Sequence, residues 1–143
     1  MFMKSKKGLI MGVANERSIA WGIAKSIANS GGQIAFTYQG EALKKRVEPL
    51  AKSINSDLII PCDVTNSSSM KNTFETLKNK WGEIDFVVHA IGFSNKDELR
   101  GKYFDTSSEN FDQTMHISCY SFTETCRLAE PLMNNGGSIL TLT

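Results

Sequence analysis

The stretch GLIMGVANERSIAWGIA, residues 8–24, decides the fold. A short apolar run reaches Gly12, a polar corner follows at 15–17, and helical spacing of apolar residues begins after Ser18. A strand, a glycine turn and a helix N-terminus in this order are typical of a parallel α/β sheet that receives a phosphate group at the helix N-terminus. The remaining sequence must show whether a ligand site of this kind is present.

The corner has the form Gly12-x5-Ser18-x3-Gly22, which is longer than the common G-x-G-x-x-G turn. Gly12 permits a tight exit from the strand, and the Ser18 hydroxyl with nearby backbone amides can hold a phosphate oxygen. We expect Gly22 to allow close packing of the helix on the sheet. Taken alone, the pattern also fits a glycine turn and a capping serine that bind nothing.

Strand and helix patterns alternate along the whole chain, with short connections between them. Such alternation predicts an α/β fold, here a Rossmann-type doubly wound parallel sheet truncated after the fifth strand, with ligands bound at the carboxyl ends of the strands. The expected strands are 8–13, 33–38, 58–64, 84–90 and 138–143. The expected helices start at 18, after the turn at 39–40, at 66 and at 106.

Two helices carry local signals that the structure can test. Pro49 predicts a kink or an early end in the second helix, because proline lacks the amide proton that a helix interior uses. Thr106-Ser-Ser-Glu109 has the form of a capping box and predicts the start of a long helix that ends near Met133. An apolar stripe is expected at Ile19, Ile23 and Ile27 in the first helix, and the last is expected to run through Phe111, Met115, Phe122, Cys126 and Leu128.

Bulk properties narrow the functional class. The 143 residues suit one domain, 1–143, and a net charge of +1 gives no electrostatic reason to expect nucleic acid or a membrane as partner. No signal peptide or membrane span is apparent, so we expect a cytoplasmic protein. The three cysteines form no C-x-x-C pair and are expected to be free and mostly buried. The two histidines lie far apart in sequence, so we expect no metal site.

Residues after the later strands add candidate contacts. Gln39 stands where dinucleotide folds often place an acid for the adenosine ribose. Its neutral amide can bond ribose hydroxyls without repelling a 2′-phosphate, so it discriminates between the two cofactors less sharply than a carboxylate does; we expect NADH rather than NADPH. The cations at 44–46 are interpreted as a solvated helix face. Asp63 either accepts a hydrogen bond from an adenine amino group or caps its own turn. Ile91-Gly92 offers flat backbone for a ribose or nicotinamide, or is an ordinary turn.

Several segments together resemble the bacterial NADH-dependent enoyl-(acyl carrier protein) reductases, a divergent branch of the short-chain dehydrogenases/reductases. The resemblance covers essentially the whole chain. The serine-bearing corner and Ile-Gly-Phe at 91–93, where ordinary members carry Asn-Ala-Gly, are its specific motifs. The matching segments are 12–24, Ala-Phe-Thr-Tyr-Gln at 35–39, Cys-Asp-Val at 62–64, His-Ala-Ile-Gly-Phe at 89–93, Tyr-Ser-Phe at 120–122 and 136–143.

The resemblance implies an activity and a set of contacts. The family acts as a homotetramer and uses NADH to reduce the trans-2 double bond of an acyl chain carried on acyl carrier protein. Ser94 matches a substrate-side position that the family often fills with alanine. The NAD-contacting positions are Gly12, Ser18, Ile19, Gln39, Asp63, Val64 and Ile91, with Gly92 alongside.

The resemblance also implies where catalysis takes place. The family's catalytic tyrosine and lysine, spaced Tyr-x6-Lys, follow the fifth strand, whereas this sequence ends at Thr143. We therefore assign no catalytic residue and expect a fragment, incomplete at its C-terminus and inactive alone, whose fifth strand has an uncovered edge. Two alternatives stay open: a 3-ketoacyl reductase of the same superfamily, and a non-catalytic nucleotide-binding module.

Overall fold

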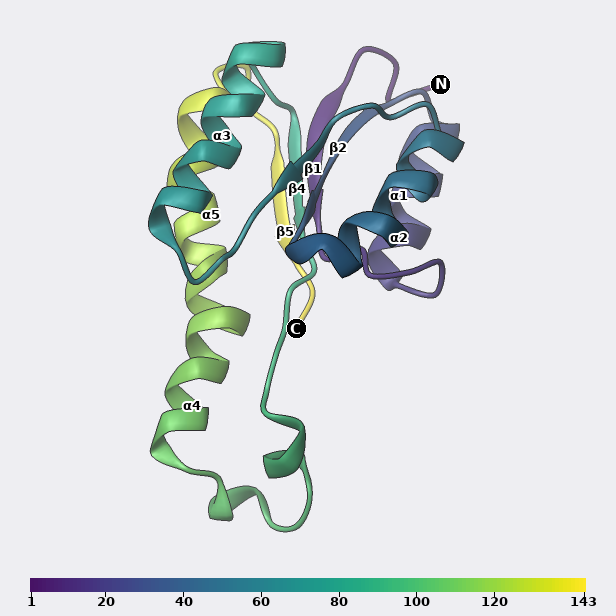
Figure 1. The fold of residues 1–143 in the computed structure, drawn as a ribbon. Helices are drawn as coiled ribbons and strands as arrows, with labels where there is room; N and C mark the ends of the chain where they lie inside the picture. The colour runs from purple at the N-terminus through teal and green to yellow at the C-terminus, as the bar shows by residue number, and fades with distance from the viewer.

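Five parallel strands form one sheet in the order β3-β2-β1-β4-β5 (Figure 1). The structure, a computed structural model, describes all residues from 1 to 143. The chain winds outward from β1 in one direction, then returns to β4 and winds in the other, which creates a topological switch point between β1 and β4. The strands are β1 Lys7–Met11, β2 Gln33–Tyr38, β3 Ile59–Pro61, β4 Phe86–His89 and β5 Ser138–Thr141.

Helices cover both faces of this sheet. In Figure 1, α1 and α2 lie on one face and α3 and α5 on the other, so the predicted doubly wound α/β fold is confirmed. None of the helices is both long and apolar enough to cross a membrane. The helices are α1 Ile19–Asn29, α2 Gly40–Ser53, α3 Ser67–Trp81, α4 Ser108–Met115 and α5 Ser121–Ala129, with a π-helical turn, η3, at His116–Tyr120 between the last two.

Each face of the sheet has its own apolar core. Successive residues of β1 alternate between them: Leu9 and Met11 face α3 and α5, whereas Ile10 faces α1 and α2. All three side chains are fully buried, as expected for a central parallel strand. Burial of a side chain of this size contributes roughly 1.5–3 kcal/mol, so β1 anchors both layers.

Four of the expected strands extend beyond the observed ones at their carboxyl ends. The first ends at Met11 rather than residue 13, and the fourth at His89 rather than residue 90. The residues that follow are apolar and so resemble strand in sequence, but they leave the hydrogen-bonded ladder. They form the walls of the cavities described below.

Two predictions about the helices on the α1–α2 face need correction. Helix α2 continues through Pro49 to Ser53, so the early end is wrong; Pro49 is exposed, and Val47 is buried against the sheet and keeps the helix in place. In α1 the buried side chains are Ala20, Trp21 and Ala24, whereas Ile19 is 72% exposed. The small alanines bring α1 close to the sheet, and of the predicted isoleucine stripe Ile23 and Ile27 pack against the core whereas Ile19 does not.

The long C-terminal helix also begins differently from the prediction. Ser107, not Thr106, is its N-cap, and its side chain accepts a hydrogen bond from the Asn110 amide at 3.1 Å. The Ser107 amide donates to the carboxylate of Glu98, which therefore fills the role expected of Glu109. The capping box is thus closed by a residue from the preceding loop, which sequence spacing could not reveal.

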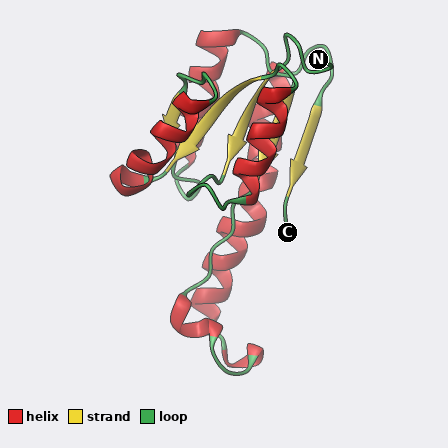
Figure 2. Ribbon diagram, turned by 90° about the vertical axis from the view of Figure 1, so that its right-hand side faces the viewer, coloured by secondary structure: helices red, strands yellow, loops and turns green.

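The helix then runs from an arm into the body of the molecule. Helix α4 and the loop that precedes it form this arm, which projects beyond the carboxyl ends of the strands, whereas α5 packs beside α3 (Figures 1 and 2). On the arm, Phe111 and Met115 are largely exposed, while Asn110 is buried. The inward stripe of α4 is therefore polar.

Of the three cysteines, only Cys62 is buried, so the expectation that most are buried is wrong.

Candidate functional site

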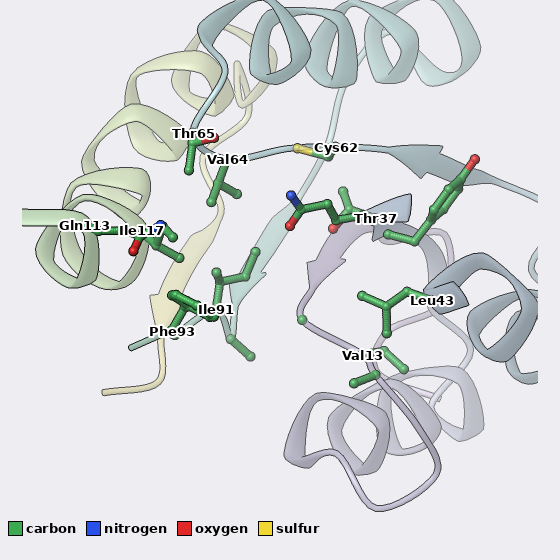
Figure 3. A pocket seen from close by; sticks show the side chains of 16 residues that line it. Val13, Thr37, Leu43, Cys62, Val64, Thr65, Ile91, Phe93, Gln113 and Ile117 are labelled. Atoms are coloured by element: carbon green, nitrogen blue, oxygen red, sulfur yellow. The ribbon is translucent and has the colours of Figure 1, made fainter. Parts of the chain in front are cut away.

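The carboxyl ends of the strands enclose a cavity of about 420 Å³ (Figure 3). It lies between the exits of β1, β2, β3 and β4, the place where open α/β sheets bind ligands. Figure 3 shows Val13, Leu43 and Thr37 on one side and Ile91, Ile117 and Val64 on the other. The lining residues are Gly12, Val13, Ala14, Thr37, Tyr38, Gln39, Leu43, Cys62, Val64, Thr65, Ala90, Ile91, Gly92, Phe93, Gln113 and Ile117.

A second cavity of about 620 Å³ lies on the β5 side. Both cavities are lined by Gly12 and by 90–92, so the exits of β1 and β4 form their common wall. Together the two cavities make an elongated crevice across the topological switch point. The second is lined by Gly12, Ser18, Ile19, Ala20, Ala90, Ile91, Gly92, Ser118, Cys119, Phe122, Thr141, Leu142 and Thr143.

The Gly12 backbone is essential to this geometry. Its φ of +106° lies in the region that favours glycine, and a Cβ at this position would collide with the Ala90 carbonyl. The exits of β1 and β4 can approach each other only because no side chain is present. Gly22, in contrast, is exposed with nothing within 4 Å of where its Cβ would lie, so the predicted role in helix packing is wrong.

Ser18 organises the corner through its side chain. Its Oγ accepts hydrogen bonds from the amides of Ala14 at 3.0 Å and Asn15 at 3.1 Å, and it does not cap an amide of its own helix. The first amides of α1, those of Ile19 and Ala20, have no acceptor within the chain. They lie at the positive end of the helix dipole beside the second cavity, where an anion can accept their hydrogen bonds.

No charged side chain lines either cavity. An anionic ligand here is therefore held by backbone amides, hydroxyls and the helix dipole. Burial raises the pKa of the Cys62 thiol, which keeps this lining group neutral. No three His, Cys, Asp or Glu side chains gather closely enough to hold a metal ion.

Comparison with known proteins decides the family. The model of the enoyl-(acyl carrier protein) reductase family matches residues 12–143. NADH-dependent enoyl-acyl-carrier-protein reductase 2 of Rhizobium meliloti is 60% identical over 141 residues, 99% of this chain and 53% of that protein. The chain belongs to the enoyl-(acyl carrier protein) reductase family.

Further enoyl reductases support this assignment. FabI of Rickettsia felis is 51% identical over 99% of this chain and 54% of its own length. The crystal structure of the enoyl reductase of Anaplasma phagocytophilum, in complex with NAD, superposes with a TM-score of 0.97 at 57% identity, over 100% of this chain and 55% of that one. The chain thus spans about half the length of the reductases it matches.

Most of the predicted contact residues lie in the crevice of this family member. Gly12, Ile91 and Gly92 line both cavities, Ser18 and Ile19 line the second, and Gln39 and Val64 line the first. Asp63 lines neither, and its Oδ1 accepts hydrogen bonds from the Thr65 amide at 2.9 Å and the Thr65 hydroxyl at 2.7 Å. Of the two interpretations of Asp63, the observed contacts are those of the turn cap.

Ser94 lies apart from both cavities. Its hydroxyl accepts a hydrogen bond from the Asn110 side chain at 3.1 Å and from the Thr114 hydroxyl at 3.1 Å, which ties it to α4. Its observed contacts are therefore with the arm. Contact with substrate stays a prediction.

Several lining residues are not evident from the sequence. Thr37 and Leu43 come from β2 and α2, whereas Ser118 and Phe122 come from the long helix more than 70 residues later. No local pattern marks them, because a helix face turned towards a crevice carries the same residue types as one turned towards a core. Only the packing of the long helix against the β4 exit brings these residues to the site.

Proposed function

We propose that this chain is the cofactor-binding half of an NADH-dependent enoyl-(acyl carrier protein) reductase. The observation that carries the proposal is the crevice at the β1–β4 switch point. The free amides of Ile19 and Ala20 border it, Gly12 and Gly92 line it, and no charged side chain does. When bound, NADH supplies the hydride for reduction of the substrate double bond. In this proposal the pyrophosphate is held by Ser18 and Ile19 and by Gly12 backbone, and the nicotinamide end lies along 91–92.

The preference for NADH is proposed from Gln39. Its neutral amide can bond ribose hydroxyls, and no lysine or arginine lines the cavity around it to attract a 2′-phosphate. Lys44 has its Nζ 6.0 Å from the centre of the Tyr38 ring and 3.9 Å from a Glu41 carboxylate oxygen. Because the Glu41 carboxylate is close to the Lys44 ammonium group, it reduces the attraction of Lys44 for a 2′-phosphate.

We propose that the catalytic tyrosine and lysine are supplied by the remainder of the protein, and that residues 1–143 alone are inactive. Tyr38 and Lys45 do have the Tyr-x6-Lys spacing. However, Tyr38 lies in β2 and Lys45 is exposed on α2, so neither follows β5 as the family pattern requires. We also propose that residues 1–143 are part of a single dinucleotide-binding domain.

The remaining proposals follow the family. We propose an acyl carrier protein-bound enoyl chain as substrate, a homotetramer as the assembly and the cytoplasm as the location, with no nucleic acid or membrane partner. The outer strand β5 is compatible with further pairing, since it lies at the edge of the sheet and pairs with β4 on one side only. A 3-ketoacyl reductase is disfavoured, because all the relatives described above are enoyl reductases.

The test is an assay of the whole protein that contains this chain. We expect NADH oxidation with a crotonyl thioester and none with an acetoacetyl thioester, and slower oxidation of NADPH than of NADH. Oxidation with the acetoacetyl substrate alone would select the ketoacyl reductase. Absence of both activities, with no NADH binding, would contradict the proposal.

A further inference from the structure

The backbone that follows β4 leaves the sheet at the cofactor crevice and finds its hydrogen-bond partners on a helix. The last ladder bonds there run from the Ala90 amide to Met11 and from the Leu142 amide to His89. Beyond them, the Ser118 hydroxyl accepts from the Phe93 amide at 3.0 Å and donates to the Phe93 carbonyl at 3.3 Å. One side chain thus satisfies both backbone groups of Phe93.

These hydrogen bonds between the chain after β4 and the long helix, here called the seam, continue outward along the arm. The Asn110 Oδ1 accepts from the Asn95 amide at 2.9 Å, and the Asn110 and Thr114 side chains both donate to Ser94. Asn110 is only 6% exposed, and these bonds are partly buried. Helix side chains therefore replace the β ladder along this segment.

At the inner end of the seam lies the fully buried His89. Its Nδ1 is 2.9 Å from the Thr141 hydroxyl and its Nε2 is 2.7 Å from Ser121 Oγ. The Ser121 hydroxyl donates its single proton to the Ile117 carbonyl at 2.6 Å, so its oxygen must accept from the imidazole. Burial lowers the pKa of His89 and so favours the neutral ring, in which the single proton lies on Nε2 and Nδ1 accepts from Thr141.

The π-helical turn η3 lies where the seam meets the crevice. It contains neither glycine nor proline, so its irregularity has no local backbone cause. The wider i→i+5 winding counters the drift of a regular helix and keeps Ser118 aligned with Asn110 and Thr114. Ser118 also lies close to the crevice wall, with its Oγ 3.8 Å from where a Cβ of Gly92 would be.

We propose that Ser118, supported by the His89–Ser121 pair, is a positioning residue that fixes the 91–93 backbone against the bound cofactor. This inference rests on the proposed function, since it assigns a purpose to the wall of the same crevice. Ile91 and Gly92 contribute backbone and a small apolar surface to the site, so their placement depends on what holds the neighbouring Phe93. Without Ser118, both backbone groups of Phe93 lose their partner within the chain.

The test compares Ser118→Ala with Ser118→Thr in the whole protein. Alanine removes both bonds to Phe93, whereas threonine keeps the hydroxyl. Ser26→Ala is the matched control, because Ser26 is an exposed helical serine without a side-chain hydrogen bond. NADH affinity is measured by fluorescence titration, the KM for NADH and kcat by steady-state assay, and protection of the Phe93 amide by hydrogen exchange.

We expect Ser118→Ala to weaken NADH binding about tenfold to a hundredfold, to raise the KM for NADH more than it lowers kcat, and to expose the Phe93 amide. Ser118→Thr and Ser26→Ala should retain the affinity of the unaltered protein. An unchanged affinity in Ser118→Ala would overturn the proposal. So would a loss of affinity that tracks a lower melting temperature and that threonine does not rescue.

Failure of the proposed function gives a different result. If the unaltered protein binds no NADH, the cofactor role is contradicted, and with it this purpose for Ser118. The buried histidine is tested without substitution, by the nitrogen chemical shifts of its ring in the unaltered protein. A proton on Nε2 at neutral pH supports the pair as described, and a proton on Nδ1 or on both nitrogens overturns it.

Discussion

The exits of β1 and β4 form two adjoining walls of the crevice, both shared by its two cavities, yet they are held in place by different means. After β1, the chain turns through Gly12 into a corner. Hydrogen bonds from the Ala14 and Asn15 amides to the Ser18 hydroxyl close this corner, so all of these groups lie within seven residues. After β4, the chain is held by side chains from a helix that begins about 20 residues later. The first wall is local in sequence and the second is assembled by tertiary packing.

This difference has physical consequences. A local corner forms with little loop-closure cost and depends on backbone conformation, so it is sensitive to any added Cβ. A seam of side-chain hydrogen bonds depends on the packing and protonation of distant groups. We therefore expect substitutions in the corner to act through sterics, and changes at the β4 exit to act through hydrogen bonding and pH.

The largest effect is expected from Gly12→Ala. The new Cβ would collide with the Ala90 carbonyl and the backbone at φ +106° disfavours alanine, so we expect a loss of about 3 kcal/mol in the free energy of unfolding together with loss of NADH binding. Gly101→Ala is the control, because Gly101 has φ +86° with open space around it and should cost only about 1 kcal/mol. Chemical denaturation measures both. Equal losses in the two variants would show that close approach of the strand exits is unimportant.

A smaller effect is expected from Ser18→Ala. The amides of Ala14 and Asn15 lose their acceptor, so the corner should loosen and NADH affinity should fall about tenfold, with roughly 1–2 kcal/mol lost in stability. Ser18→Thr retains the hydroxyl and serves as the matched comparison. Fluorescence titration and thermal unfolding measure the two effects. If alanine binds NADH as tightly as serine does, the hydroxyl does not organise the corner.

Lowering the pH should destabilise the chain around the β4 exit through His89. Burial lowers its pKa below the ordinary value of 6.5, so the unfolded chain takes up a proton before the folded one does. The contribution of neutral His89 is complete above about pH 6.5 and is lost as the pH falls from there through the folded-state pKa. Thermal unfolding from pH 8 to 5 measures this loss. In His89→Gln, which cannot titrate, that part of the pH dependence should disappear; its persistence would assign it to other groups.

The smallest effect is expected at the outer end of the arm. Hydrogen bonds from the Ser107 amide and hydroxyl lower the pKa of Glu98, so its stabilising effect is present above about pH 4.5 and is lost as the pH falls through the folded-state pKa. Glu98→Gln should raise hydrogen exchange at the Ser107 amide without changing exchange at Phe93. Equal changes at the two amides would mean that the arm opens as one unit with the β4 exit.

The local features of the fold were predictable from sequence. The apolar run before Gly12, the serine-bearing corner and the alternation of strand and helix patterns each depend on neighbouring residues. They placed Gly12, Ser18, Gln39 and Ile91 at the carboxyl edge correctly. The strands end earlier than predicted. The residues after Met11 and His89 are apolar because they line the crevice, not because they belong to a strand.

Features that depend on distant partners were not predictable. Glu98 replaces Glu109 at the start of α4, and Pro49 is tolerated in α2 because Val47 is buried against the sheet. The polar stripe of the long helix was overlooked because Asn110 and Ser118 have no apolar periodicity, and their partners are backbone groups of another segment. Single-sequence patterns report which residues are apolar, but they do not report which backbone groups need hydrogen bonds.

The most direct test of the central claim is a crystal structure of the whole protein with NAD bound. We predict that the dinucleotide crosses the crevice between the exits of β1 and β4, with its pyrophosphate accepting hydrogen bonds from the Ile19 and Ala20 amides and its nicotinamide end along Ile91 and Gly92. A dinucleotide bound elsewhere, or one whose pyrophosphate does not contact the N-terminus of α1, would contradict the account.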